Sequence, residues 1–425
     1  MRPRACALMA LAWMGVAIVV SAGDWAQWRG PHRDGHAAGD ELLPESLPEP
    51  EPAWTVPLGG GFSGVIVAGD RVFVSDERSH EEVVHALDAR TGGELWRVAY
   101  APSAGDEWGS GPRCTPLADD GRVYLQSLKG EFVCVSQEDG RRLWGTSFER
   151  DYGVTFLGGG DASDAASRRR GHNGSPVVLG DRIHVAVGSA ARGTVVAFDK
   201  RTGREVWRAG EDETAYAGLM LARSGAEDHV IGFTATALGA WNAADGSPRG
   251  SIPLRTAANR HAVTPLVLGN RVIVSSHTLG LRAFDFVEKH GAWEVRAVWE
   301  APSLKTSLST GVVVGGHLYG QGPDRDFVCV EVATGRIRWR REGFGDRPLV
   351  GHSAVIAAGS RLFVLGDDGQ GVLVAADPEG YRELSRHQYC GRTWSHPALA
   401  RGHLYIRDRR QLVAVSLGGP RAVSP

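Results

Sequence analysis

A short motif of aspartate, glycine and tryptophan recurs through almost the whole chain, and it constrains the fold more than any other feature. Its clearest copies read Ala-x-Asp-x-x-Thr-Gly-x-x-x-Trp, at residues 86–96 and 197–207. Each copy holds three alternating apolar runs and a fourth, shorter run that carries the tryptophan. Alternation of this kind is typical of β-strands. The repeat therefore predicts an array of small β-sheets.

Eight copies are present; the fourth has Gly250 where tryptophan is expected, and the last ends before its fourth strand. Segment 53–58 resembles that missing strand, with Trp54 at the tryptophan position. Its pairing with the C-terminal sheet would close a ring and remove an exposed edge. The 363 residues from Trp54 to Leu417 give about 45 per unit, the length of a four-stranded blade. The sequence predicts an all-β fold, an eight-bladed β-propeller of four-stranded antiparallel blades over residues 53–418, closed by the N-terminal strand.

The motif also predicts a turn within each copy and the packing between neighbouring sheets. The aspartate can accept hydrogen bonds from the backbone N–H groups that follow it, and the glycine can take the left-handed conformation of a turn. The 57 glycines of the chain fit a fold with many such turns. An indole eight residues after the aspartate would fill the wedge between neighbouring sheets. The repeated tryptophans are therefore interpreted as packing residues and not as binding residues.

Charge excludes one class of partner. Lysine and arginine total 47 and aspartate and glutamate total 49, so the formal net charge is −2. A nucleic-acid-binding protein carries a clustered excess of basic residues, which this chain lacks. No nucleic-acid partner is expected.

The N-terminus has the pattern of an export signal. Arg2 and Arg4 precede an uncharged apolar run over 5–20, and small residues follow at 21–22. This pattern predicts a signal peptide over residues 1–22 and a periplasmic or secreted protein without stable membrane insertion. An uncleaved anchor is the alternative. Residues 23–52 then form an N-terminal leader, and residues 419–425 form a C-terminal tail.

The cysteines suggest no metal site. The four beyond the predicted signal peptide are Cys114, Cys134, Cys329 and Cys390, and their spacings match no zinc pattern. Two of them lie in alternating apolar runs, so buried free thiols are expected, with a disulfide or metal role as the alternative.

The motif at 86–96 and 197–207 resembles the repeat of PQQ (pyrroloquinoline quinone) enzymes. That family includes eight-bladed quinoprotein dehydrogenases and the non-catalytic outer-membrane assembly scaffold BamB. The leader at 24–35 is similar to the start of exported propellers abundant in planctomycete-type bacteria, most without an assigned activity. The resemblance implies the fold and an exported setting. The adjacent cysteine pair, the calcium ligands and the catalytic aspartate of the dehydrogenases match no motif in this chain.

The axial funnel of a propeller is the natural place for a site, because residues just before each innermost strand face it. The chain places polar and aromatic residues there: Arg113, His172, Asn173, His261, His352, Trp394 and His396. Such a set could bind an anion, a peptide carboxylate or a metal. Metal ligation is disfavoured by the offset positions of the histidines. A polar, hydrated funnel whose side chains bond each other is the alternative.

Two further segments could meet a partner. The insertion at 149–171 ends in Arg168, Arg169 and Arg170, which could contact an acidic partner or polysaccharide; a solvated loop is the alternative. Trp25, Trp28 and Arg29 are expected to tie the leader across one face of the ring, where a partner-binding apron is the alternative.

Together these features predict an exported, non-catalytic propeller that serves as a scaffold or binding protein of the cell envelope. Its partner would be an envelope protein or a small polar ligand, and a monomer with no cofactor is expected. The alternative is a dehydrogenase that holds PQQ with calcium in the funnel. Carbohydrate binding through exposed tryptophans such as Trp394 is a third hypothesis.

Overall fold

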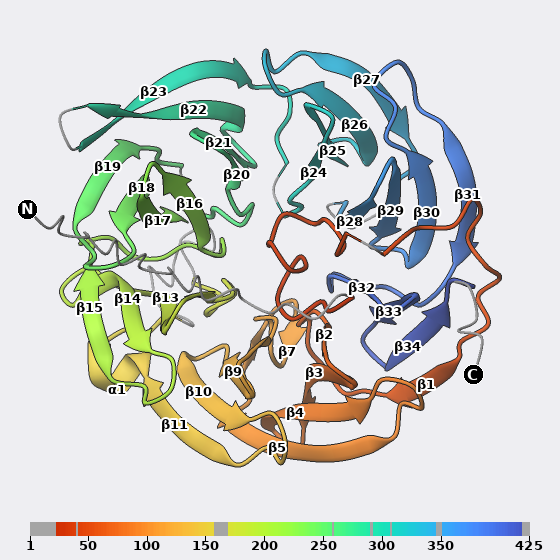
Figure 1. Cartoon of the computed structure of the whole chain (residues 1–425), viewed down its shortest axis with the longest axis horizontal. Coiled ribbons are helices and arrows are strands. Elements are labelled where there is room, and N and C mark those ends of the chain that lie inside the picture. The colour runs from red at the N-terminus through yellow and green to blue at the C-terminus, as the bar shows by residue number, and fades with distance from the viewer. Residues whose placement is uncertain are drawn as a thin grey trace, which may run out of the picture.

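The computed structural model describes residues 23–39, 41–156, 169–256, 259–289, 292–306, 308–345 and 351–418. Within these residues, eight four-stranded sheets stand as blades around a central axis (Figure 1). Seven blades use consecutive strands, and the eighth adds the N-terminal strand to three C-terminal ones. The predicted all-β, eight-bladed fold is confirmed. The predicted signal peptide (1–22) and tail (419–425) lie outside the described residues.

In the first four blades, the strands run in sequence from the innermost to the outermost. Blade 1 comprises β2 (Ile66–Ala68), β3 (Arg71–Arg78), β4 (Glu81–Asp88) and β5 (Glu94–Pro102). Blade 2 comprises β8 (Leu117–Asp119), β9 (Arg122–Gln126), β10 (Glu131–Ser136) and β11 (Arg142–Ser147). Blade 3 comprises β12 (Val177–Leu179), β13 (Arg182–Ser189), β14 (Gly193–Asp199) and β15 (Glu205–Ala209). Blade 4 comprises β16 (Met220–Ser224), β17 (Glu227–Phe233), β18 (Ala237–Asn242) and β19 (Pro248–Pro253).

The other four blades follow the same order, except that the outermost strand of the last blade is N-terminal. Blade 5 comprises β20 (Leu266–Leu268), β21 (Arg271–Ser276), β22 (Gly280–Lys289) and β23 (Ala292–Ala301). Blade 6 comprises β24 (Val312–Val314), β25 (His317–Gln321), β26 (Asp326–Glu331) and β27 (Ile337–Glu342). Blade 7 comprises β28 (Ser353–Ala358), β29 (Arg361–Gly366), β30 (Gln370–Ala375) and β31 (Glu383–Gln388). Blade 8 comprises β32 (Ala398–Ala400), β33 (His403–Arg407), β34 (Gln411–Ser416) and β1 (Trp54–Pro57).

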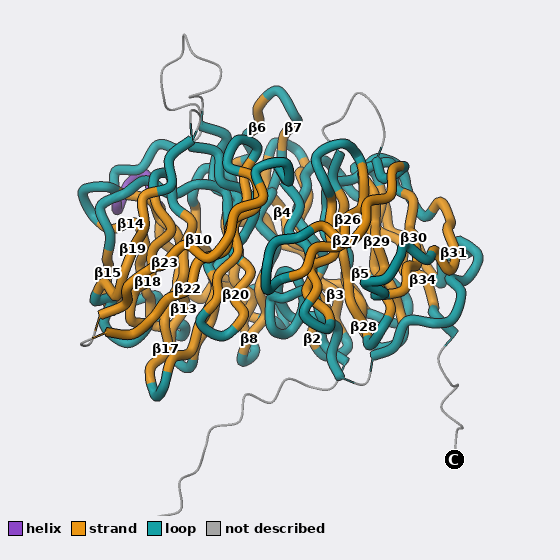
Figure 2. Tube along the Cα trace, turned by 90° about the horizontal axis from the view of Figure 1, so that it is seen from above, coloured by secondary structure: helices purple, strands orange, loops and turns teal. Residues whose placement is uncertain are grey.

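Two short elements lie between blades. The hairpin of β6 (Gly105–Asp106) and β7 (Gly109–Ser110) connects blades 1 and 2 and projects from one face of the ring, at the top of Figure 2. The helix α1 (Phe148–Tyr152) follows blade 2, and the Ser147 side chain caps its first turn by accepting from the Arg150 N–H. No helix among the described residues is long and apolar enough to cross a membrane.

The repeated tryptophans join neighbouring blades, as the motif predicts. Each indole Nε1–H donates to a backbone carbonyl of the next blade; for Trp96 the acceptor is Gln137 at 3.2 Å, and for Trp144 it is Lys200 at 3.1 Å. The same bond recurs from Trp54, Trp207, Trp299 and Trp339. The predicted role of these residues in packing is confirmed.

The Thr-Gly turns at 91–92, 202–203 and 334–335 each receive the tryptophan of the preceding blade. Asp199 Oδ1 accepts from the N–H groups of Arg201 and Thr202, and Gly203 has φ +71°. A Cβ added at Gly203 would lie 2.6 Å from ring carbons of Trp144. Glycine is therefore needed here twice, for the left-handed turn and for the close approach of the indole.

Where the motif lacks its tryptophan, another segment packs in its place. Gly250 of blade 4 lies against Trp293, which comes from an extension of the β22–β23 hairpin of blade 5 and is 9% exposed. Blade 7 has Ser385 at the corresponding register position, and its hydroxyl accepts from the backbone N–H of Leu47 in the leader at 2.7 Å. The degenerate copies are thus completed from outside the repeat.

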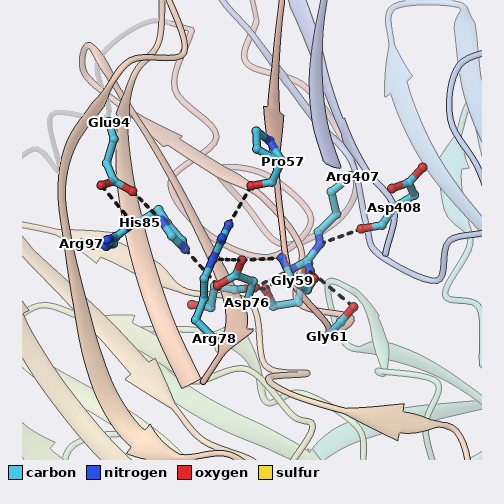
Figure 3. Close-up of polar contacts among 12 residues, drawn as sticks. Pro57, Gly59, Gly61, Asp76, Arg78, His85, Glu94, Arg97, Arg407 and Asp408 are labelled. Atoms are coloured by element: carbon cyan, nitrogen blue, oxygen red, sulfur yellow. Dashed lines mark hydrogen bonds and ion pairs between the residues drawn. The ribbon is translucent and has the colours of Figure 1, made fainter. Parts of the chain in front are cut away.

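The ring closes by pairing of β1 with β34, in which Trp54 lies opposite Ala414. A buried polar network reinforces this joint (Figure 3). Arg407 of blade 8 donates to the carbonyl oxygens of Gly59 and Gly61, both at 3.4 Å, in the segment that leads to blade 1. Asp76 of blade 1 accepts from the Gly59 N–H at 2.6 Å. The predicted closure by the N-terminal strand is confirmed.

The four cysteines named above are buried and unpaired. Burial raises the pKa of each thiol, to about 12 for Cys114, Cys134 and Cys390. A thiol with a raised pKa stays protonated at neutral pH and is unreactive, because the nucleophilic form is the thiolate. This agrees with the expected free thiols.

Candidate ligand-binding cavity

The leader crosses the central axis of the ring (Figure 1). Trp25 forms a β-bridge with Val67 of blade 1, and His36 forms one with Ala357 of blade 7. The carbonyl oxygen of Ala26 accepts from the N–H of Ala118 in blade 2, at 2.8 Å. These contacts on three separate blades confirm that the leader is tied across one face.

Two buried arginines hold the leader in this position. Arg33 donates to the carbonyl oxygens of Ser175 (3.0 Å) and Pro176 (2.7 Å), at the start of blade 3. Arg29 donates to the carbonyl oxygens of Thr310 and Gly311, on the opposite side of the ring at the start of blade 6. Desolvation lowers the pKa of both guanidinium groups to about 10, which leaves them charged at neutral pH.

Above the leader lies an axial cavity of about 470 Å³. Its floor includes Trp28 and Arg29 of the leader, and its wall comes from the loops that precede the innermost strands. Trp108 and Leu308 line it and are 41% and 40% exposed. Because Trp108 lies in the β6–β7 hairpin, the cavity opens on the face from which that hairpin projects (Figure 2). The site is a blind pocket and not a through channel.

The structure brings five of the seven predicted funnel residues into the cavity wall. These are Arg113, Asn173, His352, Trp394 and His396. They come from the joints between blades 1 and 2, 2 and 3, 6 and 7, and 7 and 8. Whether they bind a ligand stays a prediction.

The other two, His172 and His261, are not in the wall but lie buried behind it. The His172 ring packs 5.0 Å from both Phe148 and Phe156, and neither nitrogen has a hydrogen-bond partner. The His261 ring stacks on Phe233 at 4.0 Å, and its Nδ1 bonds the Thr234 carbonyl at 2.6 Å. The two share a repeat position, so their side chains point the same way, into aromatic packing between blades. Their predicted place in the funnel is wrong.

Four arginines line the cavity: Arg29, Arg113, Arg170 and Arg260. Arg113 Nη2 lies 2.5 Å from Asp106, and Arg170 Nη2 lies 2.5 Å from Glu107. Both acids belong to the β6–β7 hairpin region and lie outside the wall. Among the described residues, no carboxylate side chain lines the cavity.

The wall also holds three histidines, which carry no charge at neutral pH. Burial lowers the pKa of His352 to about 4 and that of His396 to about 3. Burial and the charge of Arg260 lower the pKa of His277. These imidazoles therefore offer hydrogen-bond donors and acceptors and leave the arginines as the cations of the site.

Aromatic rings gather on one side of the pocket, where blades 7, 8, 1 and 2 meet. Trp394 stacks on Phe62 with ring centroids 5.4 Å apart, and Trp108 packs on Trp394 at 5.5 Å. The Arg113 guanidinium lies 5.5 Å from the centre of the Phe62 ring. The cluster places flat apolar surface beside the cations.

Sequence reasoning missed several wall residues. Arg260, His277 and Leu308 lie in loops on the far side of the ring from the aromatic cluster. Trp108 lies in a hairpin that occurs once in the repeat array. The sequence predicts that Trp28 and Arg29 tie the leader to the ring, but it does not predict that they line the cavity. Arg170 belongs to the Arg run of the insertion; residues 157–168 of that insertion lie outside the described chain.

The residues present do not fit a calcium-bound quinone. The cations and rings suit the anionic, flat PQQ molecule, but calcium needs several oxygen ligands, commonly carboxylates. No carboxylate lines the described wall, and no group of three or more His, Cys, Asp or Glu residues able to hold a metal occurs among the described residues. Cys114, which precedes the wall residue Thr115, has Ser175 beside its thiol.

Comparison with known families agrees with this architecture. Residues 80–341, more than half of the chain, match the family described as outer membrane protein assembly factor BamB. The chain belongs to this BamB family of PQQ-like propellers. The BamB protein of Burkholderia pseudomallei is 26% identical over 338 residues, which cover 74% of this chain and 77% of that protein.

The BamB-family fold is shared with quinoprotein enzymes. The quinohemoprotein alcohol dehydrogenase ADH-IIG of Pseudomonas putida is 29% identical over 135 residues, which cover 30% of this chain and only 16% of the dehydrogenase. Among solved structures, BamB of Moraxella catarrhalis has a TM-score of 0.56 at 16% identity and covers 86% of this chain and 97% of its own. The quinohemoprotein alcohol dehydrogenase of Comamonas testosteroni has a TM-score of 0.65 at 13% identity and covers 95% and 82%. At these identities the structural likeness shows the fold alone.

Proposed function

We propose that the protein is an exported, non-catalytic propeller that acts as a binding or scaffold protein of the cell envelope. One observation carries this proposal: the axial pocket is closed at one end by the leader, and its wall offers cations, rings and neutral histidines but no carboxylate among the described residues. Such a wall can hold a ligand, and among the described residues it offers no carboxylate that could act as a general base.

The low pKa values of two wall histidines support a binding role. Oxidation of an alcohol needs a group that removes the hydroxyl proton, and a general base is most effective when its pKa lies near the working pH. His352 and His396, with pKa values of about 4 and about 3, are poor proton acceptors at neutral pH. The buried thiols, with raised pKa values, are not thiolates there either.

The N-terminal pattern and the relatives support the proposed setting. The run over residues 1–22 has the composition of a signal peptide. The BamB relatives are named as outer membrane assembly factors. The proposed partner is an envelope protein, or a small polar ligand in the pocket, bound by a monomeric propeller.

Two measurements test this function. Fractionation of the native host should place the processed protein, starting near Gly23, outside the cytoplasm; an unprocessed cytoplasmic protein would refute the exported role. Purified protein supplied with PQQ and calcium should show no dye-linked oxidation of primary alcohols. Turnover that depends on added PQQ would refute the non-catalytic role.

The second candidate, a PQQ-dependent dehydrogenase, is favoured by the cationic and aromatic wall and by the dehydrogenase relatives. The same assay decides between the two. A dehydrogenase would show both a change in the quinone spectrum and turnover, whereas a binding protein could show the first without the second.

A further inference from the structure

The charged groups of the pocket wall are already engaged within the protein. Arg113 forms an ion pair with Asp106, and Arg170 forms one with Glu107. The leader arginine donates to backbone carbonyl oxygens at the start of blade 6, and Arg260 has a partner as well. An ionic ligand would have to compete for these groups, and burying a charge without a partner is costly. The described groups that remain to recognise a ligand are neutral.

Three threonine hydroxyls supply neutral donors. Thr115, Thr264 and Thr310 line the cavity, and the Oγ1 atom of each accepts from a backbone N–H at the start of the preceding blade, at 2.8–3.1 Å. A hydroxyl that accepts one hydrogen bond still has its proton to donate. Among the described residues, no protein group accepts that proton from any of the three. Because the threonines precede the innermost strands of blades 2, 5 and 6, they can donate to a ligand from different sides.

His352 supplies an acceptor as well as a donor. Burial lowers its pKa to about 4, so its imidazole is neutral at neutral pH, with one nitrogen that donates and one that accepts. It lines the cavity between blades 6 and 7, and within the described chain its ring forms no hydrogen bond. Together with the threonines, it suits a ligand whose groups both donate and accept, as hydroxyls do.

The aromatic cluster supplies the third element of recognition. Trp394 stacks on Phe62, and Trp108, which is 41% exposed, packs on Trp394 at the mouth of the pocket. A sugar ring carries C–H groups on its faces and hydroxyls at its edge, so one face can cover an indole while the edge forms hydrogen bonds. The volume of about 470 Å³ lies within the range of small-molecule sites.

We propose that this pocket binds a neutral saccharide: a sugar ring packs against Trp108 and Trp394, and its hydroxyls bond the hydroxyls of Thr264 and Thr310 and the imidazole of His352. The inference rests on the proposed binding function and names the chemical class of its ligand. A cation would find no carboxylate among the described wall residues, and an anion would compete with the hairpin acids for the wall arginines. An apolar ring compound would cover the hydroxyls without bonding them, which is costly.

Titration calorimetry on the full processed chain tests this class. The neutral probes are glucose, galactose, N-acetylglucosamine and maltose; glucuronate is the charged counterpart of glucose, and 4-hydroxybenzyl alcohol is a neutral aromatic compound. At least one neutral saccharide should bind with a Kd below about 1 mM, and glucuronate should bind no more tightly than glucose. Raising the salt from about 0.05 M to about 0.5 M should leave the affinity unchanged, because no ion pair forms on binding.

Variants locate the site. Trp108→Ala should weaken binding at least about fivefold, whereas Leu95→Ala, at an exposed apolar residue of the outer strand β5, should leave it unchanged. His352→Leu removes both a donor and an acceptor and should weaken binding about threefold to tenfold. His352→Gln keeps an amide donor and acceptor and should bind more tightly than His352→Leu. Each variant is first checked by its thermal midpoint.

The outcomes separate this inference from the proposed function. Failure of all four neutral saccharides to bind at about 10 mM overturns the ligand class and leaves the non-catalytic propeller in place. The same holds if 4-hydroxybenzyl alcohol binds in their place, if glucuronate binds more tightly than glucose, or if salt weakens the binding at least about tenfold. Saccharide binding that Trp108→Ala or His352→Leu leaves at the wild-type level overturns the assigned site. PQQ-dependent turnover overturns the proposed function itself.

Discussion

The guanidinium of Arg33 donates to the carbonyl oxygen of Pro176 at 2.7 Å, although 143 residues separate the two in sequence. This bond attaches the leader, which contains no regular strand, to the start of blade 3. It works together with the opposite anchor at Arg29 to hold the floor of the cavity.

Arg33→Met should therefore release the leader. The substitution leaves the Ser175 and Pro176 carbonyl oxygens without their donor, at about 1–3 kcal/mol for unsatisfied buried groups. Part of this free-energy cost is offset, because the substitution also removes the buried charge of the Arg33 guanidinium, whose pKa desolvation lowers to about 10. Limited proteolysis followed by mass spectrometry should show faster cleavage between residues 23 and 39 than in the wild type.

The matched control is Arg71→Met. Arg71 also donates to carbonyl oxygens, of Gln137 and Glu138, but these lie between blades and not in the leader. The control should leave leader cleavage at the wild-type rate. Equal leader protection in Arg33→Met and the wild type would contradict the anchoring role.

A second prediction concerns the glycine that contacts the indole. Gly203→Ala places a methyl group 2.6 Å from Trp144 and also strains a residue at φ +71°. Gly180→Ala is the control, since Gly180 has φ +60° and nothing within 4 Å of the added atom. Both should lose about 1 kcal/mol from the left-handed conformation. Gly203→Ala should lose about 1–3 kcal/mol more through overpacking, measured by urea unfolding. Equal losses would show that the indole moves aside freely.

The repeat accounts for how well the fold follows from the sequence. Where the motif is intact, as in blades 1 and 3, its Asp-x-x-Thr-Gly turn and its tryptophan place strands and register together. The site depends on what the repeat does not encode. Arg260 and Trp108 lie in connections between blades, outside the repeated motif. The position of the leader is set by contacts such as that of Arg33 with Pro176. His172 and His261 share a repeat position but point into Phe148 and Phe233, which sequence spacing alone does not reveal.

A third prediction concerns pH and His172. Burial lowers the pKa of His172 from 6.5 to about 3. Between these values the unfolded chain binds a proton that the folded chain does not, so the stability contributed by neutral His172 is present above pH 6.5 and is lost as the pH falls. The loss between pH 8 and pH 5 is about 2 kcal/mol.

His172→Leu should remove this contribution. The difference in unfolding free energy between pH 8 and pH 5 should shrink by about 2 kcal/mol in the variant. His32→Leu, at an exposed leader residue, should leave the difference unchanged. An unchanged pH dependence in His172→Leu would show that the His172 imidazole is protonated as easily in the folded protein as in the unfolded chain.

The final prediction concerns Trp293, which the motif does not identify. Its backbone carbonyl and Cβ lie against Gly250, at the position where blade 4 lacks the repeated tryptophan, and its ring centroid is 4.0 Å from that of His229. If Trp293 takes over the role of the missing residue, Trp293→Ala should destabilise the fold by about 3–5 kcal/mol, as truncation of a buried aromatic residue does. Trp108→Ala, at an indole that is 41% exposed, should change stability by no more than about 0.5 kcal/mol. Chemical unfolding measures both, and similar small losses in the two variants would mean that blade 4 is held by its strand pairing and needs no indole at this joint.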